Sequence, residues 1–389
     1  PTTDYRTMNN RERFNATLRY RERDRCPLID FGFWAECLDA WHEEGLPADV
    51  DATNTDGYFG MDAFMRTYLS REGTDGSCLT DRGMIVPEGI RVGLVPFFED
   101  RVIEDLGDQE VVQKADGTRV RRHRRMSSIP VQEDHLLHDR KSWETHYRPR
   151  LDPSSPERYP TDWTEFDRVA RDPDREHILM LPGGSLYGWI RNWMGLEAVS
   201  YLVYDDPVLF EEMVETVCQC IHGVLTQVLE RGGAFDTCQF WEDMAYNAGP
   251  LLSPRHFRQF IAPRYRRLAE LLHSHGVEHL IVDSDGRIDD LVPLWLDAGV
   301  DTILPLEIGT TGADPIEFRK RFGRDLRIIG GFDKRILARS KPAIEAEVDR
   351  LTPLVEAGGF IPTCDHKVPP DVTLDHYRHY LDLARNRWS

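Results

Sequence analysis

Two short motifs in the chain combine side chains that bind metal ions or move protons. Asp283 and Asp285 stand two residues apart, and so do Cys364 and His366. On a strand, residues i and i+2 point to the same side, so each pair can chelate one ion. Carboxylate, imidazole and thiolate together fit zinc best, whereas carboxylates alone favour Mg²⁺ or Ca²⁺. The spacing predicts a metal site; the alternative is that Asp283 and Asp285 cap a helix and Cys364 is a small buried side chain.

A third acidic motif, Glu242-Asp243, follows Trp241. Adjacent residues on a strand point to opposite sides, so only one of the two carboxylates faces the site. We assign that position to Glu242, as a metal ligand, base or substrate anchor, with a helix cap or a salt bridge as the alternative. Asp283 and His366 are the candidate acid and base. Trp241 is a candidate substrate-binding residue.

Two glycine pairs also stand where a ligand can approach the backbone. Gly330-Gly331 precedes Lys334 and Arg335 at the start of a predicted helix. Such a turn can hold a carboxylate or phosphate through backbone N–H groups and a cationic side chain. The alternative is a tight turn with solvated cations. Gly183 and Gly184 lie in a similar position and are further substrate-binding candidates.

The elements that must position these residues alternate between strands and helices. Short apolar runs, each ending in polar residues or glycines, predict strands at 178–181, 238–241, 279–282, 302–306, 327–329 and 360–363. Helical spacing predicts helices at 207–231, 254–274, 287–298, 314–322, 342–356 and 373–386. This alternation is typical of β/α units around a parallel sheet.

The strand pattern predicts an α/β fold, a (β/α)8 TIM-type barrel. Residues 27–32 provide a further strand, and an eighth is expected between residues 50 and 105. Catalytic residues of such barrels cluster where the strands end, so the motifs above are expected to converge there. We expect a single domain over 1–389, with an insertion at 86–160 that contains a β-hairpin turning at Asp116-Gly117.

Composition limits the classes of partner. The chain has 389 residues, with 67 acidic and 48 basic side chains and a net charge of −19. This charge argues against nucleic acid and anionic membrane surfaces as partners. The cysteines number seven, which is odd, and they include no C-x-x-C pair. With no signal peptide and no apolar run long enough to span a bilayer, we expect a cytoplasmic protein with reduced thiols.

Several of these motifs together resemble the uroporphyrinogen decarboxylase superfamily, which includes the corrinoid-linked, zinc-dependent methyltransferases. The resemblance covers nearly the whole chain outside 86–160, and the family fold is a (β/α)8 barrel. The motifs are Arg11-x-x-Phe14-x-x-x-Leu18 leading to Cys26-Pro27, Trp241-Glu242-Asp243 followed by Leu252-Ser253-Pro254, Gly331-Phe332-Asp333-Lys334, and the segment 364–371.

Two departures from the family pattern bear on function. True uroporphyrinogen decarboxylases carry an Arg-Gln-Ala-Gly-Arg loop that grips substrate carboxylates, and residues 31–35 here read Phe-Gly-Phe-Trp-Ala. The methyltransferases hold zinc with a His-x-Cys pair and a distant Cys. Asp283-x-Asp285 stands at the first position, and His366, with Cys364 nearby, stands at the second. Carboxylates in place of thiolates make a metal a harder Lewis acid, which favours oxygen substrates or water.

The resemblance implies three functional hypotheses. The first is a methyltransferase that moves a one-carbon group from a small methylated substrate, with a corrinoid protein as a further partner. In this hypothesis Glu242, Asp283, Asp285, Cys364 and His366 surround a zinc ion. The second is a metal-independent decarboxylase or lyase acting on a small carboxylated substrate. The third is a non-catalytic ligand-binding homologue. Relatives in the superfamily are often dimers, so a homodimer fits the resemblance.

Overall fold

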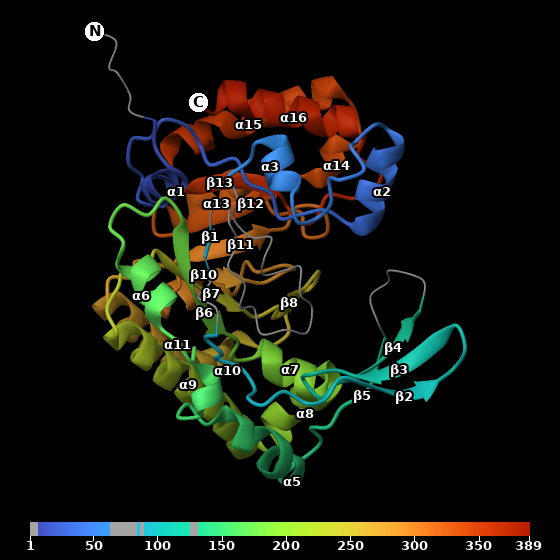
Figure 1. Ribbon diagram of the computed structural model, residues 1–389, viewed down its shortest axis with the longest axis vertical. Helices are drawn as coiled ribbons and strands as arrows, with labels where there is room; N and C mark the ends of the chain where they lie inside the picture. Colours follow the sequence, from blue (N-terminus) through green and yellow to red (C-terminus); the bar gives the residue numbers. More distant parts are fainter. Residues whose placement is uncertain (1–6, 63–83, 86–88, 125–130) are drawn as a thin grey trace.

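Seven parallel strands form the central sheet of the molecule (Figure 1). The computed structural model describes residues 7–62, 84–85, 89–124 and 131–389. The strands are β1 (Met84–Ile85), β6 (Ile178–Gly184), β7 (Thr237–Trp241), β10 (His279–Asp283), β11 (Thr302–Leu306), β12 (Arg327–Phe332) and β13 (Phe360–Cys364), and they lie side by side in this order. Every predicted strand from residue 178 onward is confirmed, and β1 falls in the 50–105 interval. The described ladders form an open order, in which none joins β13 to β1.

Buried apolar side chains fill the inner side of this sheet. Helix α1 (Asn10–Leu18) and the 27–33 segment contribute to the same cluster as the strands. Because side chains of a strand alternate between its two faces, Ile178 and Met180 of β6 both join this cluster, and β10 to β13 contribute one residue each. The members are Phe14, Leu18, Ile29, Phe31, Ile178, Met180, Ile281, Leu304, Ile329 and Ile361. A second, larger apolar cluster packs the helices against the outer side of the strands.

The prediction of a barrel strand at 27–32 is wrong, because the backbone of this segment does not form the hydrogen bonds of a strand in the described parallel sheet. The backbone N–H of Leu28 donates to the Asp62 carboxylate (2.9 Å), and that of Phe31 donates to the Asp30 carboxylate (2.8 Å). These donors are therefore used by side chains rather than by a neighbouring strand. A single parallel bridge between Phe33 and Val368 places the end of this segment beside the residues that follow β13.

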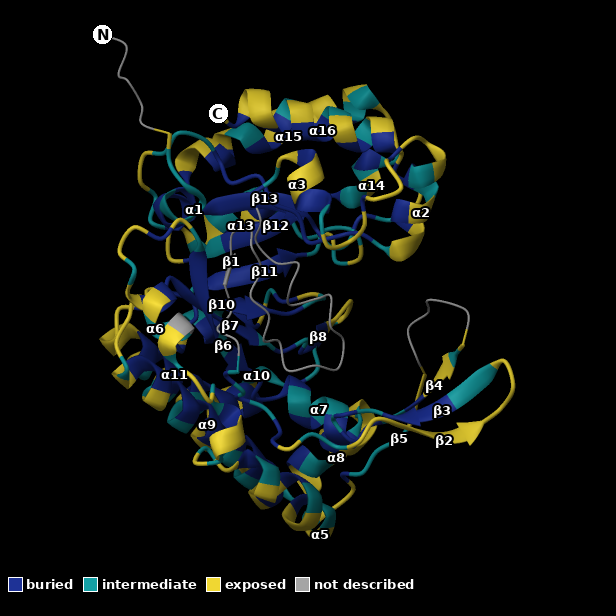
Figure 2. Ribbon diagram, in the orientation of Figure 1, coloured by how far each residue is buried: buried dark blue, intermediate teal, exposed yellow. Residues whose placement is uncertain are grey.

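Helices cover the outer side of the sheet, and buried residues line their inner faces (Figures 1 and 2). The helices that precede β7 in the chain include α2 (Ala35–Glu43), α3 (Thr55–Phe59), α6 (Thr164–Arg171), α7 (Gly188–Met194), α8 (Leu196–Asp205) and α9 (Pro207–Glu230). The later helices are α10 (Pro254–His256), α11 (Ala262–Ser274), α12 (Val292–Asp297), α13 (Pro315–Phe322), α14 (Lys334–Leu337), α15 (Lys341–Ala357) and α16 (Leu374–Arg387). No helix in the described ranges is long and apolar enough to cross a membrane.

The longest helix begins and continues as its sequence predicts. The Asp206 side chain accepts a hydrogen bond from Leu209 N (2.9 Å), and Pro207 occupies the first turn of α9. Proline is suited to this position because its missing N–H has no partner there in any case. The apolar stripe that includes Phe210 and Ile221 is buried.

Two other helices differ from their predictions. The helix predicted at 254–274 is interrupted by a π-helical turn at Phe257–Ile261, just before Pro263. Proline has no N–H to continue the ladder, so the backbone widens there. The helix predicted at 287–298 is shorter, because α12 begins only at Val292. Residues 289–291 form a turn instead.

A separate antiparallel sheet projects from the body of the molecule (Figure 1). Its strands are β2 (Arg101–Asp105), β3 (Gln109–Gln113), β4 (Arg119–His123) and β5 (Val131–Asp134). The predicted hairpin is confirmed, with β3 and β4 paired around a turn where Asp116 accepts from Thr118 N (2.9 Å). β2 is exposed along its whole length (Figure 2). The assignment of 86–160 as an insertion into a single domain stays a prediction.

Candidate functional site

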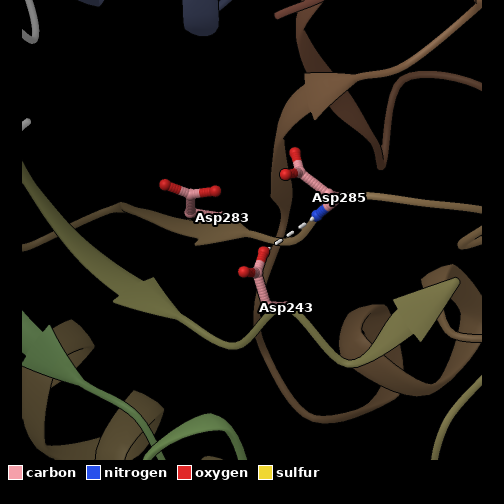
Figure 3. Close-up of side chains that lie close together, drawn as sticks. All are labelled: Asp243, Asp283 and Asp285. Atoms are coloured by element: carbon pink, nitrogen blue, oxygen red, sulfur yellow. Dashed lines mark hydrogen bonds between the residues drawn. The ribbon is translucent and has the colours of Figure 1, made fainter. Parts of the chain in front are cut away.

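Three aspartates converge where two neighbouring strands end (Figure 3). Asp243 lies two residues beyond the end of β7, Asp283 is the last residue of β10, and Asp285 follows two residues later. One carboxylate oxygen from each lies within 4.8 Å of those of the other two. The strands bring them together because Asp283 pairs with Trp241 in the parallel ladder. The ends of β7 and β10 therefore supply one shared cluster, which we call the aspartate cluster.

Burial raises the pKa of each carboxyl group in the aspartate cluster, and repulsion by neighbouring carboxylates adds to this for Asp283 and Asp285. Asp283 is 4% exposed, and its pKa is raised well above the usual range by burial and then by Asp243 and Asp285. Burial, followed by the charges of Asp243 and Glu307, raises the pKa of Asp285 to about 8. Burial also raises the pKa of Asp243, against the opposing effect of Arg191. The cluster must therefore hold protons or attract a cation.

Two buried oxygen atoms at the aspartate cluster have no donor among the described residues. One is Oδ1 of Asp285, and the other is Oε1 of Gln239, a side chain only 1% exposed. Gln239 Nε2 lies 3.4 Å from Asp283 Oδ2. Asp285 N donates to Asp243 Oδ1 at 3.3 Å, which is the dashed line in Figure 3. The cluster is thus rich in acceptors and poor in donors, a composition that fits a divalent cation.

His366 lies at the edge of the aspartate cluster. Its Nε2 is 3.6 Å from Asp285 Oδ2, and its ring centre is 4.9 Å from that of Phe31 and 6.2 Å from that of Trp34. Burial, then the charges of Lys334 and Lys367, lowers the pKa of His366 to about 4. The imidazole is therefore neutral at pH 7 and is able to bind a metal or accept a proton.

Glu242 lies outside the aspartate cluster, although the sequence prediction placed it at the site. Its fully buried carboxylate accepts hydrogen bonds from the backbone N–H groups of Leu186, Tyr187 and Gly188 (2.8–2.9 Å). The hydroxyl groups of Ser185 and Tyr265 donate to it as well. It therefore caps the start of α7, which was the alternative interpretation. Asp243, its neighbour, occupies the position that we had assigned to Glu242.

Cys364 is also placed away from the group of metal-ligating atoms. It is fully buried as the last residue of β13, and burial, with Asp30 and Asp365 as further causes, raises the pKa of its thiol well above the usual range. A thiol binds metals as the thiolate. Among the described residues, the ligand atoms that lie mutually close enough for one ion belong to Asp243, Asp283 and Asp285, and Cys364 is not among them.

The predicted substrate-binding cations differ in their surroundings. Lys334 Nζ lies 3.6 Å from Asp365 Oδ1, and the charge of Lys334 acts on both Asp285 and His366. The Arg335 guanidinium instead pairs with Asp333 at 2.8 Å and is 54% exposed. Lys334 is therefore close to the site, whereas Arg335 is held in a local ion pair at the surface.

The predicted substrate-binding glycines and Trp241 are packed against protein atoms. A Cβ at Gly183 would lie 2.6 Å from the Phe240 side chain, and one at Gly184 would lie 2.6 Å from Trp189. The close packing of Phe240 and Trp189 therefore explains the glycines at these two positions without a bound substrate. Trp241 is partly exposed, and the Arg191 guanidinium carbon lies 5.5 Å from the centre of its ring.

Other carboxylates hold the loops around the site in place. Asp365 accepts from the backbone N–H groups of Ile308 and Gly309 (both 2.9 Å). Glu307 accepts from Gly286 N (2.8 Å), directly after Asp285. Each joins the loop after one strand to the loop after another. The sequence pattern did not distinguish these two carboxylates, which accept backbone hydrogen bonds, from the carboxylates of the aspartate cluster.

Sequence reasoning also missed Gln239 and Arg191. Gln239 had a usable signal, because it stands two residues before Trp241 on a strand that is otherwise buried. Arg191 had none, since it lies on the short helix α7, whose position depends on the Glu242 cap.

The family to which the chain belongs follows from comparison with known proteins. The model of the uroporphyrinogen decarboxylase (URO-D) family matches residues 192–387, half of the chain. The chain belongs to the uroporphyrinogen decarboxylase family. It is 26% identical over 195 residues to a uroporphyrinogen decarboxylase of Thermus thermophilus, covering 48% of this chain and 51% of that protein. A uroporphyrinogen decarboxylase of Alcanivorax borkumensis is 25% identical over 203 residues, covering 47% and 50%.

These sequence matches are partial, whereas a structural match extends over the whole chain. The chain spans about half the length of the curated relatives it matches. A methyltransferase from Methanosarcina mazei superposes with a TM-score of 0.57 over 98% of this chain and 100% of that one, at 12% identity. At this identity the match supports the same α/β fold.

Proposed function

We propose that the protein is an enzyme that transfers a one-carbon group from a small methylated substrate, assisted by a divalent cation at the aspartate cluster. The observation that carries this proposal is the convergence of Asp243, Asp283 and Asp285 with an orphaned buried oxygen of Asp285. Family membership and the fold shared with a methyltransferase support it. We further propose that the 27–33 segment stands in the place of the eighth strand of a (β/α)8 barrel.

The donor set fits a metal, and it differs from the one expected from sequence. Asp243, Asp283 and Asp285 would hold the ion, with His366 as a neighbouring nitrogen ligand. We propose zinc as the ion, because His366 adds a nitrogen ligand to the carboxylates. When bound, such an ion supplies Lewis acidity that polarises an oxygen of a substrate or of water.

The residues around the cluster have separate roles in this proposal. His366, neutral at pH 7, presents Nε2 to Asp285, so this nitrogen is placed to bind the ion. Lys334 is a cation near the cluster, suited to orienting an anionic part of the substrate. Trp34, whose ring lies beside His366, provides an apolar wall that limits water. We propose a corrinoid protein as the partner that takes part in the transfer.

Metal content tests the proposal directly. The purified chain, saturated with Zn²⁺ and then desalted, is expected to retain about one equivalent by elemental analysis. Asp283→Asn should lose this ion, because the amide is a weaker ligand than the carboxylate. Asp349→Asn is the matched control, since Asp349 is an exposed carboxylate paired with Arg387. A wild-type protein that retains no metal would remove the proposal.

A metal-independent decarboxylase is the second candidate, and one observation favours it. Burial raises the pKa of Asp283 well above its usual range and that of Asp285 to about 8, so Asp285 keeps its proton at neutral pH. A neutral carboxyl group can donate a proton to the carbanion that loss of CO₂ leaves. Turnover of a small carboxylated substrate that persists with a chelator, and that Asp283→Asn abolishes, would favour this candidate over the first.

A further inference from the structure

Arg191 contacts the aspartate cluster from a helix outside the two strands that form it. Its Nη1 donates to the backbone carbonyl oxygen of Asp243, and its Nη2 lies 3.8 Å from Asp243 Oδ2. The side chain is only 15% exposed, and its guanidinium lies over the Trp241 ring. One guanidinium thus contacts both the backbone and the carboxylate of the same aspartate.

Asp243 is the member of the cluster whose backbone most needs such support. Its φ is +43°, in the left-handed region, where residues other than glycine are uncommon. Aspartate tolerates this conformation better than most residues, but it is still disfavoured relative to the usual one. This backbone turns the chain after β7, so that the side chain points toward Asp283 and Asp285 (Figure 3). An interaction that fixes the Asp243 carbonyl therefore also fixes the direction of its carboxylate.

The helix that carries Arg191 is itself fixed by the residue before Asp243. Glu242 accepts the backbone N–H groups at the start of α7, and Arg191 lies one turn into this helix. Glu242 therefore fixes the position of α7, and α7 in turn places Arg191 against Asp243. A shift of the Arg191 guanidinium would break its contacts with Asp243 or move α7 away from Glu242. This reciprocal arrangement gives Arg191 a defined position that a solvated surface arginine lacks.

We propose that Arg191 is a positioning residue, which orients Asp243 toward Asp283 and Asp285 and so completes the cation site. This inference rests on the proposed function, because it concerns the same cation. Arg191 acts through Asp243 and does not contact the ion. A positively charged group can serve here because its hydrogen bond goes to the Asp243 carbonyl, whereas its nearest approach to the carboxylate is 3.8 Å.

Calorimetric titration of the full chain with Zn²⁺ and with Mn²⁺ tests the inference. Arg191→Gln is expected to weaken the affinity by about 10- to 100-fold, the usual effect of losing a group that orients a metal ligand. Arg191→Lys should be intermediate, since Lys keeps one donor for the carbonyl but loses the second contact. This conservative variant also serves if Arg191→Gln folds poorly.

A matched control comes from a similar arginine far from the site. Arg231 pairs with Asp167 at 2.7 Å and lies 4.1 Å over the Trp163 ring, so Arg231→Gln loses the same kinds of contact. Its affinity for either ion should stay within about twofold of the wild type. Thermal unfolding of both glutamine variants separates a loss of affinity from a loss of folded protein.

A double variant shows whether Arg191 acts through Asp243. In an Asp243→Asn background, Arg191→Gln should change the affinity by less than about twofold, because the ligand that it orients is already altered. An equal loss in both backgrounds would overturn the inference, as would Arg191→Gln binding like the wild type. If the wild type binds neither ion, the proposed function fails and the inference with it. If the wild type binds and Arg191→Gln binds equally, the inference alone fails.

Discussion

Carboxylates occur in two contrasting settings in this molecule, the aspartate cluster and the projecting antiparallel sheet. In the sheet, Asp105, Glu110 and Asp134 lie within 2.9 Å of Arg124, Arg122 and Arg119, respectively. The Asp105 pKa is lowered, by the Gly107 N–H group and then by Arg124. In the cluster, three aspartates face one another, and among the described residues Asp243 has Arg191 at 3.8 Å while Asp285 has the neutral imidazole of His366 at 3.6 Å.

The difference between these regions follows from their position in the fold. Antiparallel neighbours bring residues of different strands directly opposite one another, so opposite charges pair across the sheet. Parallel strands instead deliver their last residues to one shared edge. When these residues are acids, as at β7 and β10, their carboxyl groups gather in one place, where Asp283 is buried and Asp243 and Asp285 are partly exposed. The first arrangement is stable by itself, whereas the second requires protons or a cation.

The largest change in the free energy of unfolding should come from removing a third kind of carboxylate, one that is buried and fully hydrogen-bonded. Glu242→Ala leaves the amides of Leu186, Tyr187 and Gly188 without their acceptor, and it should lower the free energy of unfolding by about 3–5 kcal/mol. Urea denaturation measures this change. Glu242→Gln, which keeps one acceptor, should lose less. A loss below about 1 kcal/mol for the alanine variant would contradict the capping role.

Removing a carboxylate from the aspartate cluster should instead stabilise the protein, by a smaller amount. In chelator-treated protein at pH 8, Asp283→Asn should increase the free energy of unfolding by about 1–2 kcal/mol. The reason is that burial, with Asp243 and Asp285 nearby, disfavours the ionised form of Asp283, which the unfolded chain adopts freely at this pH. The same denaturation experiment reports the change, with Asp349→Asn as the reference for an exposed acid. Equal stability of wild type and Asp283→Asn would show that the cluster is not strained.

The pH dependence of stability should separate the two regions further. Asp285 keeps its proton up to a pKa of about 8 in the folded protein, whereas an unfolded aspartate loses it near pH 4. Its contribution is therefore fully present below about pH 4 and is lost as pH rises toward 8. The Tm of chelator-treated wild type should fall between pH 5 and pH 8.5 by about 2–4 °C more than that of Asp285→Asn. Parallel curves for the two proteins would contradict the raised pKa.

The smallest effect is expected in the projecting sheet. Glu133 pairs with Arg121 near the surface, and exposed ion pairs contribute little because water and salt screen them. Glu133→Ala should lower the free energy of unfolding by less than about 1 kcal/mol. A loss as large as that of Glu242→Ala would remove the contrast between the two settings.

Much of the fold could be predicted because its strands have a strong local pattern. Each run from 178 onward is apolar on both sides, as a strand covered on both faces must be, and each ends at a polar residue or a glycine. The segment 27–32 has the same appearance, yet side chains of Asp30 and Asp62 take its backbone donors. That outcome depends on Asp62, which lies 34 residues from Leu28. No local pattern reveals such a partner.

The candidate site was predictable in its location and less so in its members. Asp283 and Asp285 lie together because they follow one strand, and His366 lies beside them because another parallel strand ends at the same edge. The choice between Glu242 and Asp243 depended on alternation along a regular strand. Strand β7 ends at Trp241, Asp243 adopts a left-handed backbone conformation, and the Glu242 side chain caps α7. The rule that side chains point alternately to two sides therefore does not apply to these two residues.

The sequence by itself determined the order of strands and helices, the acidic character of the chain and the set of polar residues that follow the strands. These depend on local periodicity and composition, which act over a few residues. Only the tertiary structure decided which acids are satisfied and which are free, because that depends on donors brought from distant segments. Glu242 accepts hydrogen bonds from five donors, whereas Asp283 has the side-chain amide of Gln239 at 3.4 Å. Burial therefore raises the pKa of Asp283 well above its usual range, since a carboxylate with few donors is costly away from water.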